Sequence, residues 1–167
     1  MLESDNWWTP EYILDVVRAV LGPIPLDPCT DKSNPTKASS FLTVEDNALQ
    51  RMWAVPYFCN PPYSQASKWI EYALMQYVPG LLLVPADTST KMVQALMRHH
   101  FCCFLAKRPK FIDPKTGNPS KQTGRKAIML ALVSKPGQET LARVFCDKAN
   151  TLGLVSHRNF YNPIPFG

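Results

Sequence analysis

Apolar positions along the chain gather in short continuous runs that are separated by polar turns. Four of these runs have the length and composition of buried strands, because they are rich in aliphatic and aromatic residues and are bounded by Gly, Pro, Asn or charged residues. They are WAVPYFC (53–59), GLLLVP (80–85), FCCFLA (101–106) and AIMLALV (127–133). Two shorter apolar stretches, IPLDPC (24–29) and FLT (41–43), predict short strands earlier in the chain.

Other stretches carry apolar residues at helical spacing and alternate with the predicted strands. The first helix is predicted over 12–21, with Thr9 as N-cap, Pro10 at the first helical position and Gly22 as its end. Further helices are predicted over 65–77, 88–99 and 137–150, and a helical turn over 46–52. Strands that alternate with helices of this length predict βαβ units. The sequence therefore predicts an α/β fold with a largely parallel sheet, in one domain spanning 1–167.

The stretch FCNPPYSQ (58–65) stops a strand abruptly. Pro61 and Pro62 have no backbone N–H to donate, so the strand cannot continue beyond Asn60. The two prolines also make the turn rigid, and Ser64 is placed to cap a helix that starts at Gln65. A rigid polar turn between a strand and a helix is where open α/β sheets place their chemistry.

Composition narrows the class of protein. No apolar run approaches the roughly 20 residues of a membrane helix, and MLESDNWW lacks the regions of a signal peptide, so we expect a cytoplasmic protein without membrane contact. The five cysteines are odd in number and contain no CxxC pair. This argues against a disulfide framework and against a metal site, and predicts buried reduced thiols.

Positive charge is concentrated in one segment. The net charge is +5, and residues 107–126 hold seven Lys or Arg against the single Asp113. We call this segment the basic loop. Such local charge suits the phosphate backbone of a nucleic acid, with binding that weakens steeply in salt. The alternative is a solvated surface loop without a partner.

Several blocks, in order along the chain, resemble one family of enzymes. NPPY (60–63) at the end of a strand is the catalytic tetrapeptide of S-adenosylmethionine methyltransferases that act on amino groups. The supporting blocks are WWTP (7–10), LDPC (26–29), TVEDNAL (43–49), LLLVPAD (81–87) and RPKF (108–111). Together they resemble the compact phage-type DNA N6-adenine methyltransferases. The resemblance implies a Rossmann-like class I methyltransferase sheet in abbreviated form, S-adenosylmethionine as cofactor, DNA as substrate, and a phage or prophage origin, with the host cytoplasm as location.

The resemblance also implies the catalytic residues. The amino nitrogen of adenine is a poor nucleophile, since its lone pair is delocalised into the ring. The side-chain oxygen of Asn60 and the carbonyl of Pro61 would accept its two hydrogens, and Pro62 would keep both acceptors aimed. The ring of Tyr63 would stack on an adenine flipped out of the duplex, and Phe111 would close its other face. A core position is an equally good interpretation of Phe111.

The cofactor residues implied by the resemblance lie in three blocks. Asp27 would bind the methionine amine, and Thr9 and Pro10 would lie beside the methionyl carboxylate. Asp46 would accept from the adenine amino group, with Glu45 as the neighbouring alternative. The full set is Trp8, Thr9, Pro10, Asp27, Pro28, Glu45 and Asp46.

Two departures from the broader family affect the cofactor site. The segment LDPCTDKSNPTK contains no glycine-rich turn, and only 16 residues separate Cys29 from Asp46, too few for the usual helix and strand. The acid that would hold the ribose hydroxyls has no matching position, and Asp31 is the candidate.

The chain has no room for a separate DNA-recognition domain, so the basic loop is the predicted DNA contact. The candidate phosphate-binding residues are Lys107, Arg108, Lys110, Lys121, Arg125 and Lys126. Two alternatives remain open. The same chemistry could act on cytosine N4, on rRNA adenine or on a protein glutamine, or the domain could bind DNA without catalysis. No residue pattern indicates the target sequence or the oligomeric state.

Overall fold

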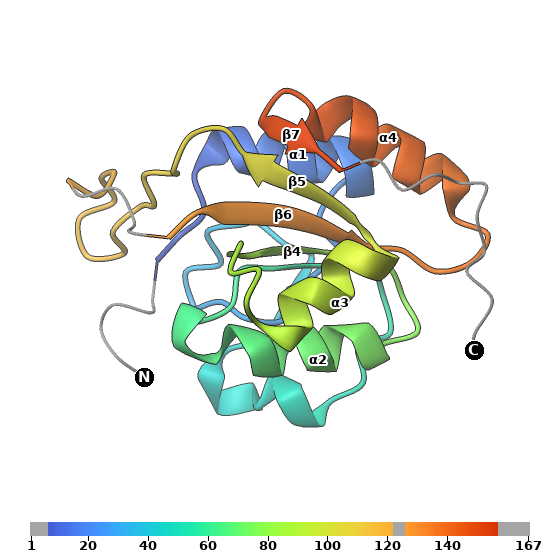
Figure 1. Ribbon diagram of the computed structural model, residues 1–167. Coiled ribbons are helices and arrows are strands. Elements are labelled where there is room, and N and C mark those ends of the chain that lie inside the picture. The colour runs from blue at the N-terminus through green and yellow to red at the C-terminus, as the bar shows by residue number, and fades with distance from the viewer. Residues whose placement is uncertain (1–6, 122–125, 157–167) are drawn as a thin grey trace.

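The chain folds around one central sheet, shown in the computed structural model of Figure 1. The structure describes residues 7–121 and 126–156. In this part of the chain the sheet has seven strands in the order β2-β1-β3-β4-β6-β5-β7. The strands are β1 (Leu26–Asp27), β2 (Ser40–Phe41), β3 (Tyr57–Cys59), β4 (Gly80–Pro85), β5 (Phe101–Leu105), β6 (Ile128–Val133) and β7 (Gly153–Val155).

Strand directions confirm the predicted α/β class, and they show which strands are antiparallel in the largely parallel sheet. β1 pairs in parallel with β2 and β3, and β3 pairs in parallel with β4. β6 is antiparallel to both β4 and β5, and β7 is antiparallel to β5. Among the described strands, β1 to β5 therefore share one direction, and β6 and β7 run against it. β5 and β6 are joined without a crossover helix, and neighbouring strands joined in this way run antiparallel. The arrangement is an open α/β sheet with a parallel half and an antiparallel edge.

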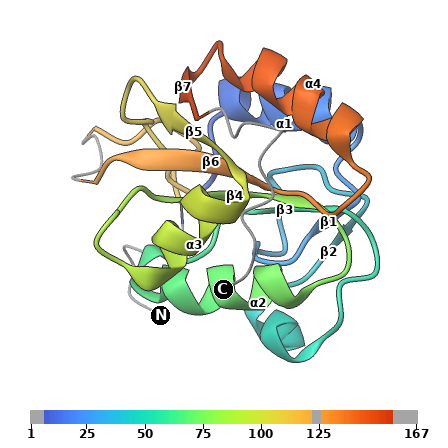
Figure 2. The ribbon, with the colours of Figure 1, turned by 45° about the vertical axis from the view of Figure 1, so that its right-hand side comes forward.

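Helices cover both faces of the sheet (Figures 1 and 2). The helices α1 (Glu11–Leu21) and α4 (Glu139–Ala149) lie on one face, and α2 (Ala66–Met75) and α3 (Lys91–His99) lie on the other. Side chains of β4 alternate between the two cores. Leu81 and Leu83 pack with α1 and α4, whereas Leu82 and Val84 pack with α2 and α3. This two-sided burial explains why β4 is apolar at every position.

The starts of three helices differ from the sequence predictions. Helix α1 begins at Glu11 with Pro10 as N-cap and without a side-chain cap, so Thr9 is not the cap. Ser64 does not cap a helix at Gln65 either, because Tyr63–Gln65 form a tight 3-10 turn before α2. In this turn the Pro62 carbonyl accepts from the Gln65 N–H at 2.9 Å. Helix α3 begins at Lys91, where the Thr90 hydroxyl accepts from the Val93 N–H at 3.4 Å.

The connection from β1 to β2 contains no helix, as the shortness of the segment predicted. Asn34 and Lys37 take positive φ values of 46° and 54° in this connection. The Asn34 side chain accepts from the Ala38 N–H at 3.1 Å and donates to the Ala38 carbonyl at 3.0 Å. Side-chain hydrogen bonds of this kind take the place of a helix in holding the backbone turn.

The chain after α4 forms a short edge strand that the sequence analysis did not predict. The strand β7 pairs with β5 from Cys103 to Leu105. The later segment NFYNPIPFG (159–167) lies outside the described residues. The three residues of β7 are too few to show the alternation or the apolar run that predicts a strand.

Candidate active site

The NPPY turn lies at the carboxyl end of β3, at the rim of a cavity of about 560 Å³. The cavity is lined by residues from four segments of the chain, which are 7–9, 27–36, 43–49 and 60–69. These segments come together because the carboxyl ends of β1 and β3 lie side by side in the sheet. The volume is within the range of cofactor sites, roughly 300–1,000 Å³.

Asn60 is held by a contact with the segment before α1. Its side-chain nitrogen Nδ2 donates to the carbonyl of Trp7 at 3.1 Å. A carbonyl can only accept, so the amide nitrogen must face Trp7. This bond fixes the orientation of the side-chain amide and leaves Oδ1 without a part in it, on a residue that lines the cavity.

Pro61 and Pro62 differ in their position relative to the cavity. Pro61 is buried and does not line the cavity, whereas Pro62 lines it. The Pro62 carbonyl is bonded to Gln65, which closes the 3-10 turn. The turn therefore holds the backbone on the carboxyl side of Pro61, and β3 holds it on the amino side.

Tyr63 and Phe111 are in direct contact. Their ring centroids lie 5.9 Å apart, with an interplanar angle of 81°, which is an edge-to-face arrangement. Phe111 is 8% exposed and belongs to the core on the α1 and α4 face. The Tyr63 hydroxyl is buried without a hydrogen-bond partner among the described residues, and burial raises the Tyr63 pKa. The structure thus brings the two rings together, but against each other rather than on either side of a gap.

Asp27 supplies a buried carboxylate at the cavity wall. It is 2% exposed and accepts from the Cys29 N–H at 3.0 Å and from the Thr36 hydroxyl at 2.8 Å. Burial raises the Asp27 pKa to about 6, against the partial opposing effect of these hydrogen bonds. Pro28 lines the cavity beside it. A buried carboxylate of this kind is suited to a cationic ligand.

Trp8 and Asp31 form a second polar contact at the same cavity. The indole Nε1 of Trp8 donates to Asp31 Oδ2 at 2.6 Å, and Asp31 Oδ1 accepts from the Ser33 N–H at 2.7 Å. Both residues line the cavity, as does Thr9, whereas Pro10 does not. The oxygen atoms of Asp31 are therefore held in place from two directions.

The structure distinguishes Glu45 from Asp46. Asp46 Oδ2 accepts from the Thr43 N–H at 2.9 Å and from the Thr43 hydroxyl at 3.0 Å, in a reciprocal cap of the turn Val44–Asp46. These hydrogen bonds lower the Asp46 pKa. Glu45 lines the cavity and pairs with Lys32 at 3.0 Å, while Asp46 is absent from the lining. Of the two alternatives, Glu45 is the one that reaches the cavity.

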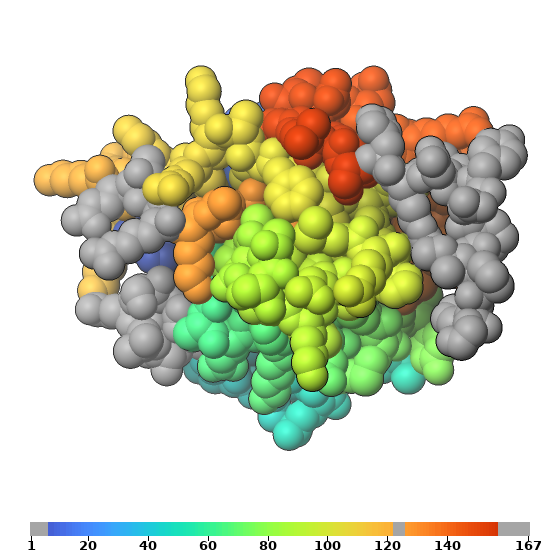
Figure 3. Space-filling view, viewed as in Figure 1, coloured from blue at the N-terminus to red at the C-terminus, as the bar shows by residue number. Residues whose placement is uncertain are grey.

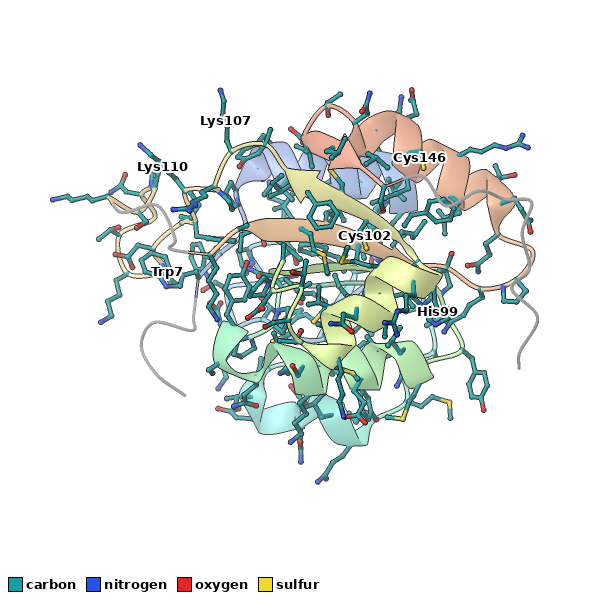
Figure 4. All side chains as sticks on the ribbon, in the orientation of Figure 1. Trp7, His99, Cys102, Lys107, Lys110 and Cys146 are labelled. Carbon is teal, nitrogen blue, oxygen red and sulfur yellow. The ribbon has the colours of Figure 1, made fainter. Side chains whose placement is uncertain are left out.

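The basic loop is attached to the segment before α1. Trp8 N donates to the Ile112 carbonyl at 3.0 Å, and Ile112 N donates to the Trp8 carbonyl at 2.9 Å. Figure 4 shows Lys107 and Lys110 pointing outward on the same side of the molecule as Trp7, and Figure 3 shows the loop at this edge. The described cationic residues of the predicted contact are all exposed, and Arg125 lies outside the described residues. The exposed residues are Lys107, Arg108, Lys110, Lys121 and Lys126.

A second cavity of about 350 Å³ lies on the other side of the NPPY turn. Its lining includes Tyr63, Asp87 and Lys126, and both Gln65 and Lys68 line this cavity as well as the first. Hydrogen bonds from Ser89, together with the charge of Lys126, lower the Asp87 pKa. The sequence analysis did not single out Gln65 or Lys68 as site residues, because polar residues in the first turn of a helix are common.

Three further features bear on the class of protein. All five cysteines are free thiols. Over 7–121 and 126–156, no group of three or more His, Cys, Asp or Glu is placed to hold a metal ion. No helix in the same ranges is long and apolar enough to span a membrane.

Comparison with known proteins identifies the family. A family model described as DNA N-6-adenine-methyltransferase (Dam) matches residues 2–155. None of the curated proteins matches the sequence. Among solved structures, the crystal structure of 23S rRNA methyltransferase ErmE is similar at 11% identity, covering 83% of this chain and 75% of that chain with a TM-score of 0.49. The chain belongs to the DNA N-6-adenine-methyltransferase (Dam) family, whose reaction is the S-adenosylmethionine-dependent methylation of the N6 amino group of adenine in DNA.

Proposed function

We propose that Asn60 Oδ1 and the Pro61 carbonyl accept the two N6 hydrogens of an adenine that has been flipped out of DNA. The observation that carries this proposal is the hydrogen bond from Asn60 Nδ2 to the Trp7 carbonyl at the rim of the larger cavity. This bond leaves the Asn60 oxygen as the group that faces a substrate. The acceptor is set before the substrate arrives.

Two fixed acceptors suit the chemistry of an amino group. The adenine N6 lone pair is delocalised, and the nitrogen becomes nucleophilic only as it pyramidalises and gains positive charge. Acceptors aimed at its hydrogens stabilise that charge without reorganising during the reaction. S-Adenosylmethionine, when bound, supplies a methyl group on an electrophilic sulfonium. Within the chain, the proline turn keeps the acceptors in place and no strong base is required.

The lining of the larger cavity supports S-adenosylmethionine as its ligand. Asp27 is a buried carboxylate with a raised pKa, and a methionine ammonium group would supply its missing cationic partner. Thr9 lines the cavity directly before the start of α1, where a carboxylate is favoured by the free N–H groups of a helix. Asp31 would hold the ribose hydroxyls and Glu45 would accept from the adenine amino group, and both residues line the cavity.

The DNA would lie across the exposed edge that carries the basic loop. Its described cations are placed to contact phosphates, which set the position of the duplex rather than read its sequence. Tyr63 would stack on the flipped base after its ring leaves the edge of Phe111. A reaction on DNA with this cofactor is consistent with the cytoplasm as location, and with the host cytoplasm if the gene is phage-encoded.

The test is incorporation of label from methyl-labelled S-adenosylmethionine into unmethylated DNA, followed by digestion to nucleosides. We expect label in the N6-methyl derivative of deoxyadenosine, and a loss of roughly 100- to 1,000-fold in Asn60→Ala. Asn150→Ala, an exposed position after α4, is the matched control and should retain full activity. Cofactor binding by Asn60→Ala, measured in parallel, shows that the variant is folded.

Each contrary outcome points to a different conclusion. Full activity in Asn60→Ala would overturn the assigned role of its side chain. Label in cytosine, RNA or protein in place of DNA adenine would identify one of the alternative substrates. If the unaltered protein does not bind the cofactor, the remaining hypothesis is a domain that binds DNA without catalysis.

A further inference from the structure

Two adjacent residues, Trp7 and Trp8, contact three functional parts of the molecule. The Trp7 carbonyl accepts from Asn60 Nδ2 at 3.1 Å, across 53 residues of sequence. The Trp8 indole donates to Asp31 at 2.6 Å at the cofactor cavity. The Trp8 backbone exchanges two hydrogen bonds with Ile112 of the basic loop. A single dipeptide therefore joins the catalytic amide, the candidate ribose-binding acid and the candidate DNA contact.

The attachment of this dipeptide differs on its two sides. On its carboxyl side it leads through buried Thr9 and Pro10 into α1, where Ile13 and Leu14 are 0% and 1% exposed. On the side of the basic loop it is held by one isolated bridge and not by a strand. An isolated bridge near the surface opens at much lower cost than a core strand. The bridge can therefore exist in formed and open arrangements while α1 remains in place.

The basic loop makes a second contact next to the bridge. Phe111, which precedes Ile112, packs edge-on against the ring of Tyr63. The loop thus contacts the NPPY turn directly at Tyr63 and, through the Trp7 carbonyl, indirectly at Asn60. Any ligand that orders residues 111–112 favours the arrangement in which Trp8 is also held.

We propose that the Trp7–Trp8 segment couples DNA contact by the basic loop to cofactor binding, with Trp8 as a positioning residue for Asp31. DNA that binds the loop would favour the formed Trp8–Ile112 bridge. The formed bridge orients the Trp8 indole toward Asp31 and the Trp7 carbonyl toward Asn60. The cofactor favours the same arrangement from the side of Asp31. By linkage, each ligand raises the affinity for the other by the same factor. This inference rests on the proposed function, because it requires both ligands to bind.

The experiment measures the affinity for S-adenosylhomocysteine, which has no methyl group to transfer, with and without a DNA duplex that the protein methylates. For the unaltered chain we expect DNA to tighten this binding by at least about fivefold. Trp8→Phe keeps an aromatic ring but removes the N–H that Asp31 accepts, and we expect the DNA effect to fall to less than about twofold.

Tyr77→Phe is the control, because it also removes a polar group from an aromatic side chain, at a residue that is 84% exposed and lines neither cavity. We expect it to retain the DNA effect. Asp31→Ala completes a double-mutant cycle, in which Trp8→Phe should add little once both acceptor oxygens are lost. Measuring the effect of S-adenosylhomocysteine on DNA affinity must return the same factor in each variant.

Two results would overturn the coupling. One is an equal DNA effect in Trp8→Phe and Tyr77→Phe, and the other is an unaltered chain in which DNA leaves the affinity unchanged. Both can occur while the protein still methylates DNA, so they count against this inference alone. Failure of the unaltered protein to bind S-adenosylhomocysteine or to methylate DNA would instead contradict the proposed function.

Discussion

The cofactor cavity and the basic loop are two functional regions built on different physical principles. Two carboxylates at the cavity wall, Asp27 and Asp31, are buried and half-buried, and hydrogen bonds hold each of them, as the Thr36 hydroxyl and the Cys29 N–H hold Asp27. The described cations of the loop are exposed, and isolated bridges through Ile112 attach the loop to its surroundings. Under the proposed function, the difference is that between a preformed small-molecule site and a surface that binds mainly through charge.

The largest effect in this comparison is expected at Asp27. Asp27→Asn removes the charge that would pair with the cofactor amine, so affinity for S-adenosylhomocysteine should fall about 10- to 100-fold. The same change should stabilise the protein without ligand at pH 7 by about 2 kcal/mol, since a buried charge is removed. Binding titrations and thermal unfolding measure the two effects. Asp147→Asn, at an exposed position of α4, should change neither.

The cavity should show a pH dependence that arises from Asp27. The Asp27 pKa of about 6 lies above its ordinary value of 3.8, so the folded protein binds this proton more tightly than the unfolded chain. The stability that this proton adds is present below pH 4 and is lost as the pH rises through about 6. Cofactor affinity should follow the opposite course and fall roughly tenfold between pH 7 and pH 5. Asp27→Asn should show no such dependence, and a pH-independent affinity in the unaltered protein would contradict the assignment.

DNA binding through the basic loop should depend steeply on salt concentration. Lys107→Gln and Lys110→Gln should each weaken DNA binding at low salt and reduce the slope of log K against log salt by about 1. Arg98→Gln is the matched control, because it lies at the end of α3 next to His99, which Figure 4 places away from Lys107 and Lys110. DNA titrations at several salt concentrations measure the slopes. Equal slopes in all variants would mean that the loop does not contact phosphates.

The smallest expected effect lies between the two regions, at Tyr63. Tyr63→Phe removes a buried hydroxyl that has no partner among the described residues, so the protein should gain about 1 kcal/mol of stability. Tyr72→Phe removes a hydroxyl that donates to the Arg51 carbonyl at 3.0 Å and should lose about 1 kcal/mol. Chemical denaturation measures both changes. A loss of stability in Tyr63→Phe would show that the hydroxyl is bonded in solution.

The long strands, the one-domain α/β class and the NPPY turn could be predicted from the sequence because each depends on local pattern. β4 was predicted with its observed bounds, since Gly80 is followed by five apolar residues before the turn at Ala86 and Asp87. The helix starts were less accurate. The turn at Tyr63–Gln65 and the cap at Pro10 depend on backbone bonds that residue preference alone does not specify.

The sequence by itself determined which residues are able to carry the chemistry, because the residue types and spacing of WWTP, LDPC and NPPY are visible in one dimension. The tertiary structure decided how they are held. It placed Trp7 against Asn60 across 53 residues, turned Glu45 rather than Asp46 toward the cavity, and packed Phe111 against Tyr63. These contacts follow from the packing of α1, β3 and the basic loop at one edge of the sheet, and such packing depends on the whole chain and not on any local pattern.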